Sequence, residues 1–141
     1  MRYFVTGATG FIGKRLVKKL LERKGTVVYF LLRPESADKA AELRKYWGVT
    51  ATRAIAVAGD LTSKKLGVSA ADIKTLKGQI DHFYHLAAVY DLAAGTETQV
   101  AVNIDGTRNT LELARAIEAG HFHHVSSIAA AGLYEGVFRE D

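Results

Sequence analysis

Cysteine is absent from this 141-residue chain, so no disulfide framework can stabilise it. No apolar run approaches the roughly 18 residues that a membrane-spanning helix needs, and no basic segment followed by an apolar one opens the chain. These absences exclude a disulfide-rich secreted scaffold and predict a cytoplasmic protein that does not engage a membrane. Apolar residues make up 48% of the sequence, which is enough for one domain with a real core.

A concentrated patch of one charge is also lacking, although the net charge is +4. Lysine and arginine are scattered along residues 14–24, 39–53 and 64–77 and are not gathered with aromatic residues. Solvated helix surfaces explain this distribution, so we expect no nucleic-acid partner. The same positive field would favour a polyphosphate cofactor.

What the chain does contain is a regular alternation of apolar and amphipathic segments. The apolar runs at residues 3–5, 26–32, 54–58, 80–88 and 121–127 are typical of strands that are covered on both faces. The segments between them, 14–24, 36–47, 69–76 and 96–119, predict helices. With right-handed crossovers, this order predicts an α/β fold with a doubly wound parallel sheet and strand 3–5 at its centre. Ligands of such sheets bind at the carboxyl ends of the strands.

The turn after the first strand carries Gly7, Gly10 and Gly13, each three residues from the next. Gly7 is expected to take a positive φ, Gly10 to let the backbone approach a pyrophosphate, and Gly13 to allow close packing of helix on strand. The N-terminus of the following helix would then face the anion. The pattern predicts a dinucleotide-binding turn, with an ordinary glycine-rich turn as the alternative.

Arg33 follows strand 26–32, at the point where an NAD-selective site usually places an acidic residue for the ribose 2′-hydroxyl. A guanidinium can form a forked contact with a 2′-phosphate and stack on adenine. The residue therefore favours NADP over NAD as the cofactor. A surface arginine that caps the strand is the alternative.

Asp60 and Leu61 end the third strand, where the carboxylate could accept from the adenine amino group while Leu61 packs on the ring. Asp60 is equally suited to capping the following turn. At the end of the fourth strand, the small residues Ala87 and Ala88 would let the backbone come close to a ribose or a nicotinamide. His85 is expected to pack within its strand.

The fifth strand ends in Ser126 and Ser127, either of which could hydrogen-bond a substrate carbonyl or simply cap the strand. We expect the loops that carry Arg33, Asp60, Ala87 and Ser127 to converge on one crevice. Among the histidines at 121, 123 and 124, strand alternation sends His123 and His124 to opposite faces, and no cysteine or acidic residue is adjacent, so no metal site is predicted there.

Five motifs in this order, residues 6–13, 59–61, 85–88, 103–107 and 125–127, resemble the extended short-chain dehydrogenase/reductase family. Arg33 and the strand 124–127 are most similar to its NADPH-dependent reductases, including the fatty-acyl and thioester reductase branch. The resemblance implies a Rossmann fold with NADP as cofactor, and Ser127 as the catalytic hydroxyl that orients a carbonyl. The cofactor-binding residues that it implies are Gly7, Thr9, Gly10, Phe11, Ile12, Gly13, Arg33, Asp60, Leu61, Leu86, Ala87, Ala88, Asn103 and Ser126.

The family's reductases also use a tyrosine as proton donor with a lysine four residues later, and none of the six tyrosines here is followed by such a lysine. The resemblance therefore implies that residues 1–141 form the N-terminal dinucleotide-binding domain of a longer NADP-dependent dehydrogenase or reductase. The Rossmann sheet would be truncated after strand five, and the fragment would be inactive by itself.

The expected partner is a small carbonyl or acyl substrate. Two alternatives stay open: a nucleotide-binding sensor module without catalysis, and an epimerase or dehydratase that uses a bound nicotinamide. The resemblance also implies a homodimer through helix 96–119, although core packing explains its apolar stripe equally well.

Overall fold

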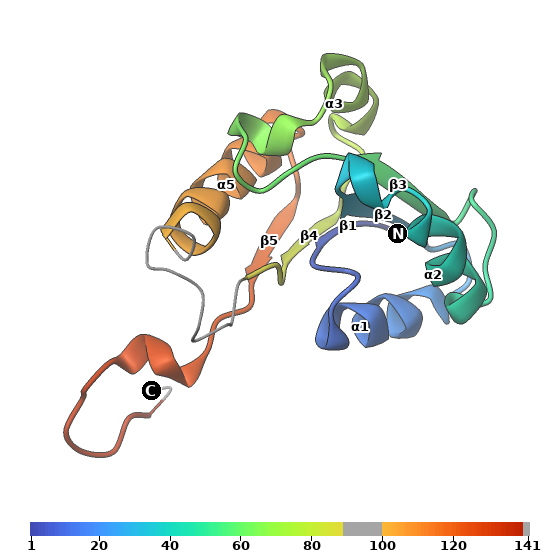
Figure 1. The fold of residues 1–141 in the computed structure, drawn as a ribbon. Helices are drawn as coiled ribbons and strands as arrows, with labels where there is room; N and C mark the ends of the chain where they lie inside the picture. Colours follow the sequence, from blue (N-terminus) through green and yellow to red (C-terminus); the bar gives the residue numbers. More distant parts are fainter. Residues whose placement is uncertain (89–99, 140–141) are drawn as a thin grey trace.

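The computed structural model describes residues 1–88 and 100–139, which build a five-stranded parallel sheet flanked by helices (Figure 1). The strands are β1 (Arg2–Thr6), β2 (Val27–Leu32), β3 (Ala54–Ala58), β4 (His82–His85) and β5 (His121–His124), in the order β3-β2-β1-β4-β5. Strand β1 is central, as predicted, and the chain moves outward from it in one direction through β2 and in the other through β4. The predicted doubly wound α/β fold is confirmed, with its topological switch at the carboxyl ends of β1 and β4.

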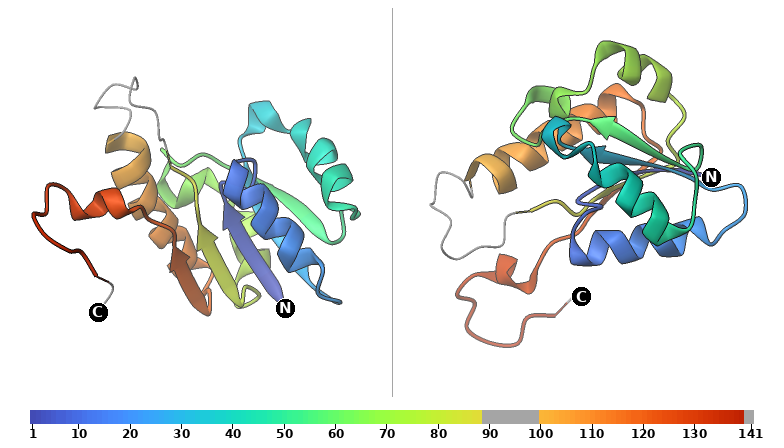
Figure 2. Two further views of the ribbon diagram at one scale, coloured as in Figure 1. Left: turned by 90° about the horizontal axis from the view of Figure 1, so that it is seen from below. Right: turned by 45° about the vertical axis from the view of Figure 1, so that its right-hand side comes forward.

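Helices cover both faces of the sheet, as the two further views make clear (Figure 2). Helices α1 (Phe11–Leu21) and α2 (Lys39–Trp47) pack on one face, where Val17, Leu43 and Trp47 join a core with alternate residues of β1 and β2. Helices α3 (Ala70–Leu76) and α5 (Gly106–Ala116) lie on the other. Along residues 1–88 and 100–139, no helix combines the length and apolar character that crossing a membrane requires.

Strands β4 and β5 are shorter than the predicted runs 80–88 and 121–127. The ladder between them extends from His82 opposite His121 to His85 opposite His124, and β1 ends at Thr6 opposite His85. Residues 86–88 and 125–127 follow the last residues of β4 and β5 and lie outside the strands. The apolar residues Leu86, Ala87 and Ala88 border a cavity, whereas residues 125–127 do not line it.

Helix α1 was predicted at residues 14–24, but it begins at Phe11 and ends at Leu21. Its last carbonyls are held by Arg53, whose Nη2 donates to the carbonyl of Leu21 at 2.7 Å and to that of Arg23 at 3.1 Å. Gly25 then reverses the chain with a φ of +74°. The helix therefore ends one turn earlier than its charged and apolar pattern suggested.

The segment predicted as helix 96–119 differs from that prediction in its helix type and in the residue at which it ends. Residues 96–99 lie outside the described part of the chain, Val100–Asp105 form a π-helix, and α5 ends at Ala116. Thr107 and Thr110 each donate from Oγ1 to the carbonyl four residues earlier, at 2.7 Å. Side-chain bonds of this kind compete with the regular ladder and often bend helices, and the bond of Thr107 spans the boundary between the π-helix and α5.

The apolar stripe predicted on residues 96–119 is divided between core and surface. Ala114 and Ile117 are buried together with Leu113, whereas Ile104 is 55% exposed. Packing against the sheet thus explains the C-terminal part of the stripe. The homodimer stays a prediction.

Short 3₁₀ helices complete the connections, at Pro34–Ser36, Lys64–Gly67 and Ile128–Ala131. The first begins at Pro34, two residues after the end of β2, where proline cannot continue the strand's hydrogen bonding.

Candidate functional site

The glycine turn follows β1 directly and is packed backbone against backbone. Gly7 has a φ of +75°, as predicted, and a Cβ added there would lie 2.7 Å from the amide nitrogen of Ala87. A Cβ at Gly13 would lie 2.1 Å from the carbonyl oxygen of Gly7. Gly13 therefore permits close packing as expected, but against the turn itself and not against a strand. Side chains at either position would push the turn away from its neighbours.

Helix α1 begins directly after this turn, with Gly10 as its extended N-cap residue. Within the described part of the chain, no side chain caps the first amides, and the first turn contains no acidic residue. Free amides and the positive end of the helix dipole both favour an anion at this position. Phe11 and Ile12 are 76% and 61% exposed beside it.

The turn borders a cavity of about 450 Å³ at the carboxyl ends of β1 to β4. Val102 of the π-helix also lines it. The predicted cofactor-binding residues that it brings together are Gly7, Thr9, Gly10, Arg33, Asp60, Leu61, Leu86, Ala87 and Ala88.

The other predicted residues do not line this cavity. Phe11, Ile12 and Gly13 continue from Gly10 into α1, and Asn103 is the neighbour of Val102. Ser126 and Ser127 are exposed in the loop after the edge strand β5. The expectation that this loop converges on the same cavity as the others is therefore not met, because the chain turns away into the 3₁₀ helix at 128–131.

Arg33 lies at the β2 end of the cavity, where Ser36 and Lys39 also line the wall. The Nε of Arg33 is 3.4 Å from Oε1 of Glu35, and both side chains are 64% exposed. An exposed ion pair of this kind is worth little, so Arg33 can leave Glu35 for a stronger anion. Sequence reasoning missed Ser36 and Lys39. The signal was available, because a segment that follows a parallel strand starts at the ligand-binding edge.

Asp60 lines the cavity and also holds its own turn. Its Oδ1 accepts from the backbone N–H of Thr62 at 2.7 Å and from the Thr62 hydroxyl. The side-chain and backbone hydrogen bonds from Thr62, together with the charge of Arg33, hold the pKa of the Asp60 carboxyl below its usual value. The capping role that the sequence left open is thus present, in a carboxylate that also borders the cavity.

His85 packs within β4, as expected, and is 1% exposed. Its Nδ1 lies 2.7 Å from Oγ1 of Thr6, and its Nε2 lies 3.1 Å from Oγ1 of Thr107. Burial, and secondarily the neighbouring His124, lowers the pKa of His85 to about 4. The side chain is therefore a neutral imidazole at physiological pH.

The remaining histidines stack on one another. Nδ1 of His82 lies 3.0 Å from Nε2 of His123, and the ring of His123 stacks on Tyr84 with centroids 4.4 Å apart. Burial and the neighbouring His121 and His123 lower the pKa of His82. Among the described residues, no group of three or more histidine, cysteine, aspartate or glutamate side chains could hold a metal ion.

The sequence as a whole matches a known family over most of its length. The model of the NAD-binding family described as "Male sterility protein" matches residues 5–141. The chain belongs to this family. It is of the extended short-chain dehydrogenase/reductase type, so the resemblance to the fatty-acyl reductase branch is confirmed.

Relatives within this type are considerably longer. Fatty acyl-CoA reductase 1 from Xenopus laevis is 32% identical over a match that covers 89% of this chain and 28% of the relative. The terminal R domain from the myxalamid PKS-NRPS biosynthetic pathway has a TM-score of 0.81 and 29% identity, covering 96% of this chain and 37% of that structure. UDP-glucuronic acid 4-epimerase from Bacillus cereus in complex with NAD has a TM-score of 0.72 and 28% identity, covering 100% and 44%. The chain thus spans less than half the length of these proteins.

Proposed function

We propose that this chain is the cofactor-binding part of an NADP-dependent oxidoreductase of the extended short-chain dehydrogenase/reductase type. The whole protein would transfer hydride between NADPH and a carbonyl or acyl substrate. The observation that carries the proposal is the uncapped start of α1 behind a glycine turn, at the mouth of a cavity that borders four strand ends. Membership of an NAD-binding family that includes reductases supports it.

We assign the residues along the cavity to the successive chemical groups of NADP. The amides at the start of α1, after Gly10, would hold the pyrophosphate, and Arg33 with Lys39 would bind the 2′-phosphate. Leu61 would pack on adenine, and the small residues Ala87 and Ala88 would admit the nicotinamide end. The nicotinamide supplies the hydride when bound. What this chain contributes is binding and orientation.

Ser127 is the hydroxyl that we propose to hydrogen-bond the substrate carbonyl, which polarises it for hydride attack. The side chain of Ser127 is exposed after β5, and neither Ser127 nor its sequence neighbours line the cavity.

The choice of NADP over NAD can be tested at Arg33. We expect the wild-type chain to bind NADPH about tenfold more tightly than NADH, the size of one charge-assisted contact, and Arg33→Ala to abolish this difference. A protein-detected NMR titration with both nucleotides measures even weak affinities. The control is Arg115→Ala, which removes an exposed arginine from the last turn of α5. Equal affinities for both nucleotides in the wild-type chain would remove the phosphate argument.

The chain alone should not catalyse the reaction. No tyrosine in its sequence is followed by a lysine four residues later, so the proton donor of the family's reductases is not among its residues. Incubation of the 141-residue chain with NADPH and an aldehyde or acyl thioester should therefore leave NADPH unconsumed. Steady hydride transfer in this assay would contradict the proposal.

A second candidate is an epimerase or dehydratase, in which the nicotinamide is reduced and reoxidised within one turnover. The likeness to the NAD-bound epimerase over the whole of this chain favours it. Consumption of NADPH together with substrate by the longer protein would indicate a reductase, whereas turnover without consumption would indicate an epimerase. Occupancy without turnover would indicate a sensor module.

A further inference from the structure

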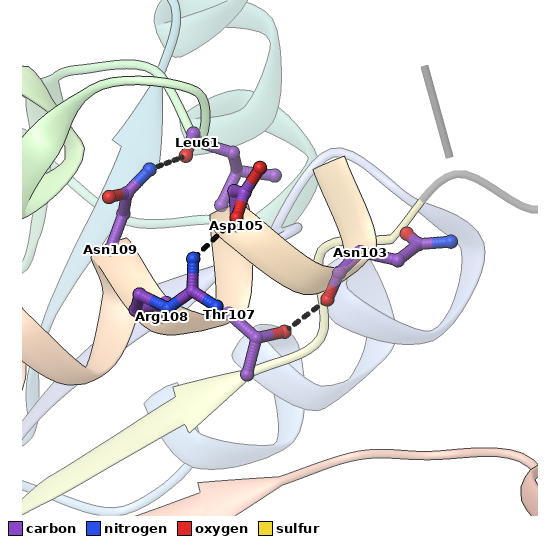
Figure 3. Close-up of polar contacts among 6 residues, drawn as sticks. All are labelled: Leu61, Asn103, Asp105, Thr107, Arg108 and Asn109. Atoms are coloured by element: carbon purple, nitrogen blue, oxygen red, sulfur yellow. Dashed lines mark hydrogen bonds and ion pairs between the residues drawn. The ribbon is translucent and has the colours of Figure 1, made fainter. Parts of the chain in front are cut away.

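The first turns of helix α5 contact His85, which directly precedes the loop after β4, and Leu61 in the loop after β3; Figure 3 shows the contact with Leu61. Thr107 lies against His85, the last residue of β4, and Asn109 donates from Nδ2 to the carbonyl of Leu61 at 2.8 Å. These two loops stand at opposite ends of the cavity, one after β4 and the other after β3. Neither Thr107 nor Asn109 lines the cavity itself.

The contacts of His85 allow only one arrangement of protons. Thr107 Oγ1 donates its proton to the carbonyl of Asn103 at 2.7 Å, so it must accept from Nε2 of His85. Nδ1 is then an acceptor and takes the proton of Thr6 Oγ1 at 2.7 Å. Thr6 Oγ1 in turn accepts from the backbone N–H of Ala87 at 3.4 Å. The result is a directed chain of hydrogen bonds through a neutral imidazole.

This chain of hydrogen bonds ends at the close backbone contact between Gly7 and Ala87. Thr6 directly precedes Gly7, and the backbone of Ala87 is what a Cβ on Gly7 would strike. Thr6 and His85 are 0% and 1% exposed, so water cannot readily replace either partner. The hydroxyl of Thr107 thereby fixes how closely the loop after β4 approaches the glycine turn.

The hydrogen bond from Asn109 to Leu61 fixes the loop after β3 in the same manner. Asn109 is 9% exposed, and Leu61 follows Asp60 in the wall of the cavity. Both contacts start from a helix that is anchored on the sheet by the buried side chains Leu113, Ala114 and Ile117. Helix α5 is therefore a rigid base from which two loops are positioned independently.

We propose that Thr107 and Asn109 are positioning residues, each for one half of the bound dinucleotide; this rests on the proposed function. The adenosine half of a dinucleotide lies toward the end of β2, and the pyrophosphate lies at the start of α1. Asn109, through Leu61, positions the adenosine half. Thr107, through His85 and Thr6, positions the nicotinamide half beside Ala87.

The test uses two probes, NADP⁺ and its adenosine half, adenosine 2′,5′-bisphosphate, in protein-detected NMR titrations. We expect Asn109→Leu to weaken both probes by the same factor of about 5–10, as for one buried hydrogen bond. Thr107→Val should weaken NADP⁺ by a similar factor and leave the bisphosphate within about twofold, and Thr107→Ser should restore the wild-type value. The matched control is Thr75→Val, because Thr75 makes the same bond to the carbonyl four residues earlier on the exposed surface of α3.

The outcomes separate this inference from the proposed function. If the wild-type chain binds both probes and the two variants weaken them identically, the inference is wrong and the proposed function stands. If the wild-type chain binds neither probe at millimolar concentration, the inference and the proposed function are both wrong. A second measurement needs no nucleotide: ¹⁵N spectra of the imidazoles should show His85 neutral, with its proton on Nε2. A proton on Nδ1, or a charged ring at pH 7, would overturn the chain of hydrogen bonds directly.

Discussion

At the scale of single residues, most of the polar chemistry at this site serves to fix backbone segments. Asp60 accepts two hydrogen bonds from Thr62, and His85 bridges two threonine hydroxyls from distant parts of the sequence. In both cases the same side chain lies on, or next to, the wall of the cavity. Substitutions here would therefore change stability together with ligand binding, and variants must be assessed for both.

The first prediction concerns His85 and pH. The folded-state pKa of about 4 lies below the ordinary 6.5, so the unfolded chain binds more protons between these values. The stabilisation that results is complete above pH 6.5 and is lost as the pH falls toward 4, by at most about 3 kcal/mol. Urea unfolding of the wild type should show this loss, and His85→Gln should remove most of it.

The control for this measurement is His124→Gln, which removes an exposed imidazole from the neighbouring strand. It should retain most of the decline. His82 contributes in the same direction, since its pKa is also lowered, and it is present in all three proteins. A His85→Gln profile as steep as that of the wild type would show that His85 does not titrate as its burial implies.

At the scale of elements, α1 depends on a residue from outside the helix. Arg53 precedes β3 and donates to the carbonyls of Leu21, Arg23 and Thr26, which lie at and beyond the C-terminus of α1. Carbonyls at a helix end have no partner within the helix, and a guanidinium satisfies several of them at once. The pairing joins the end of α1 to the start of β3.

We therefore expect Arg53→Ala to lower the free energy of unfolding by about 1–3 kcal/mol, the range for charge-assisted hydrogen bonds of this kind. Hydrogen exchange should accelerate most at the last turn of α1. Lys45→Ala, an exposed cation on α2, is the control and should change neither quantity measurably. Faster exchange spread evenly over the sheet would instead indicate a global effect.

The helices and strands also show how much of the secondary structure the sequence patterns predict. Strand 54–58 was predicted to the residue, and α2 ends at Trp47 as predicted, where Gly48 follows with a positive φ, although the helix begins at Lys39 and not at residue 36. Strand β4 was predicted too long, since Leu86 and Ala87 are as apolar as a strand but face a cavity. The π-helix at Val100–Asp105 has no signature in hydrophobic periodicity.

The candidate site likewise contains residues whose positions the sequence could predict and residues whose positions it could not. Gly7, Arg33 and Asp60 were predictable because each stands at a strand end, and strand ends meet at one edge of a parallel sheet. The positions of Ser126 and Ser127 were not, because β5 is an edge strand whose following loop has a neighbouring strand on one side only. The roles of Thr107 and Asn109 could not be read from the sequence either. They depend on contacts with His85 and Leu61, 22 and 48 residues away.

At the scale of the whole molecule, the remaining prediction concerns self-association through the long helix. Ile104 belongs to the apolar stripe that the sequence assigns to a dimer interface, and it remains 55% exposed. If that interface forms, light scattering should give twice the chain mass of 15.3 kDa, and Ile104→Asp should reduce it to the single-chain value. Thr75→Val, remote on α3, should leave the mass unchanged. A wild-type mass of 15.3 kDa would contradict the dimer.

The stacked imidazoles of β4 and β5 determine where the sheet would yield to acid. His82 contacts His123 and stacks on His121, and these two residues belong to the edge strand. Burial and these two neighbours lower the pKa of His82, so a proton on its ring at low pH destabilises the rungs that join β5 to β4. We therefore expect acid to weaken the pairing of the edge strand β5 with β4, at the margin of the sheet.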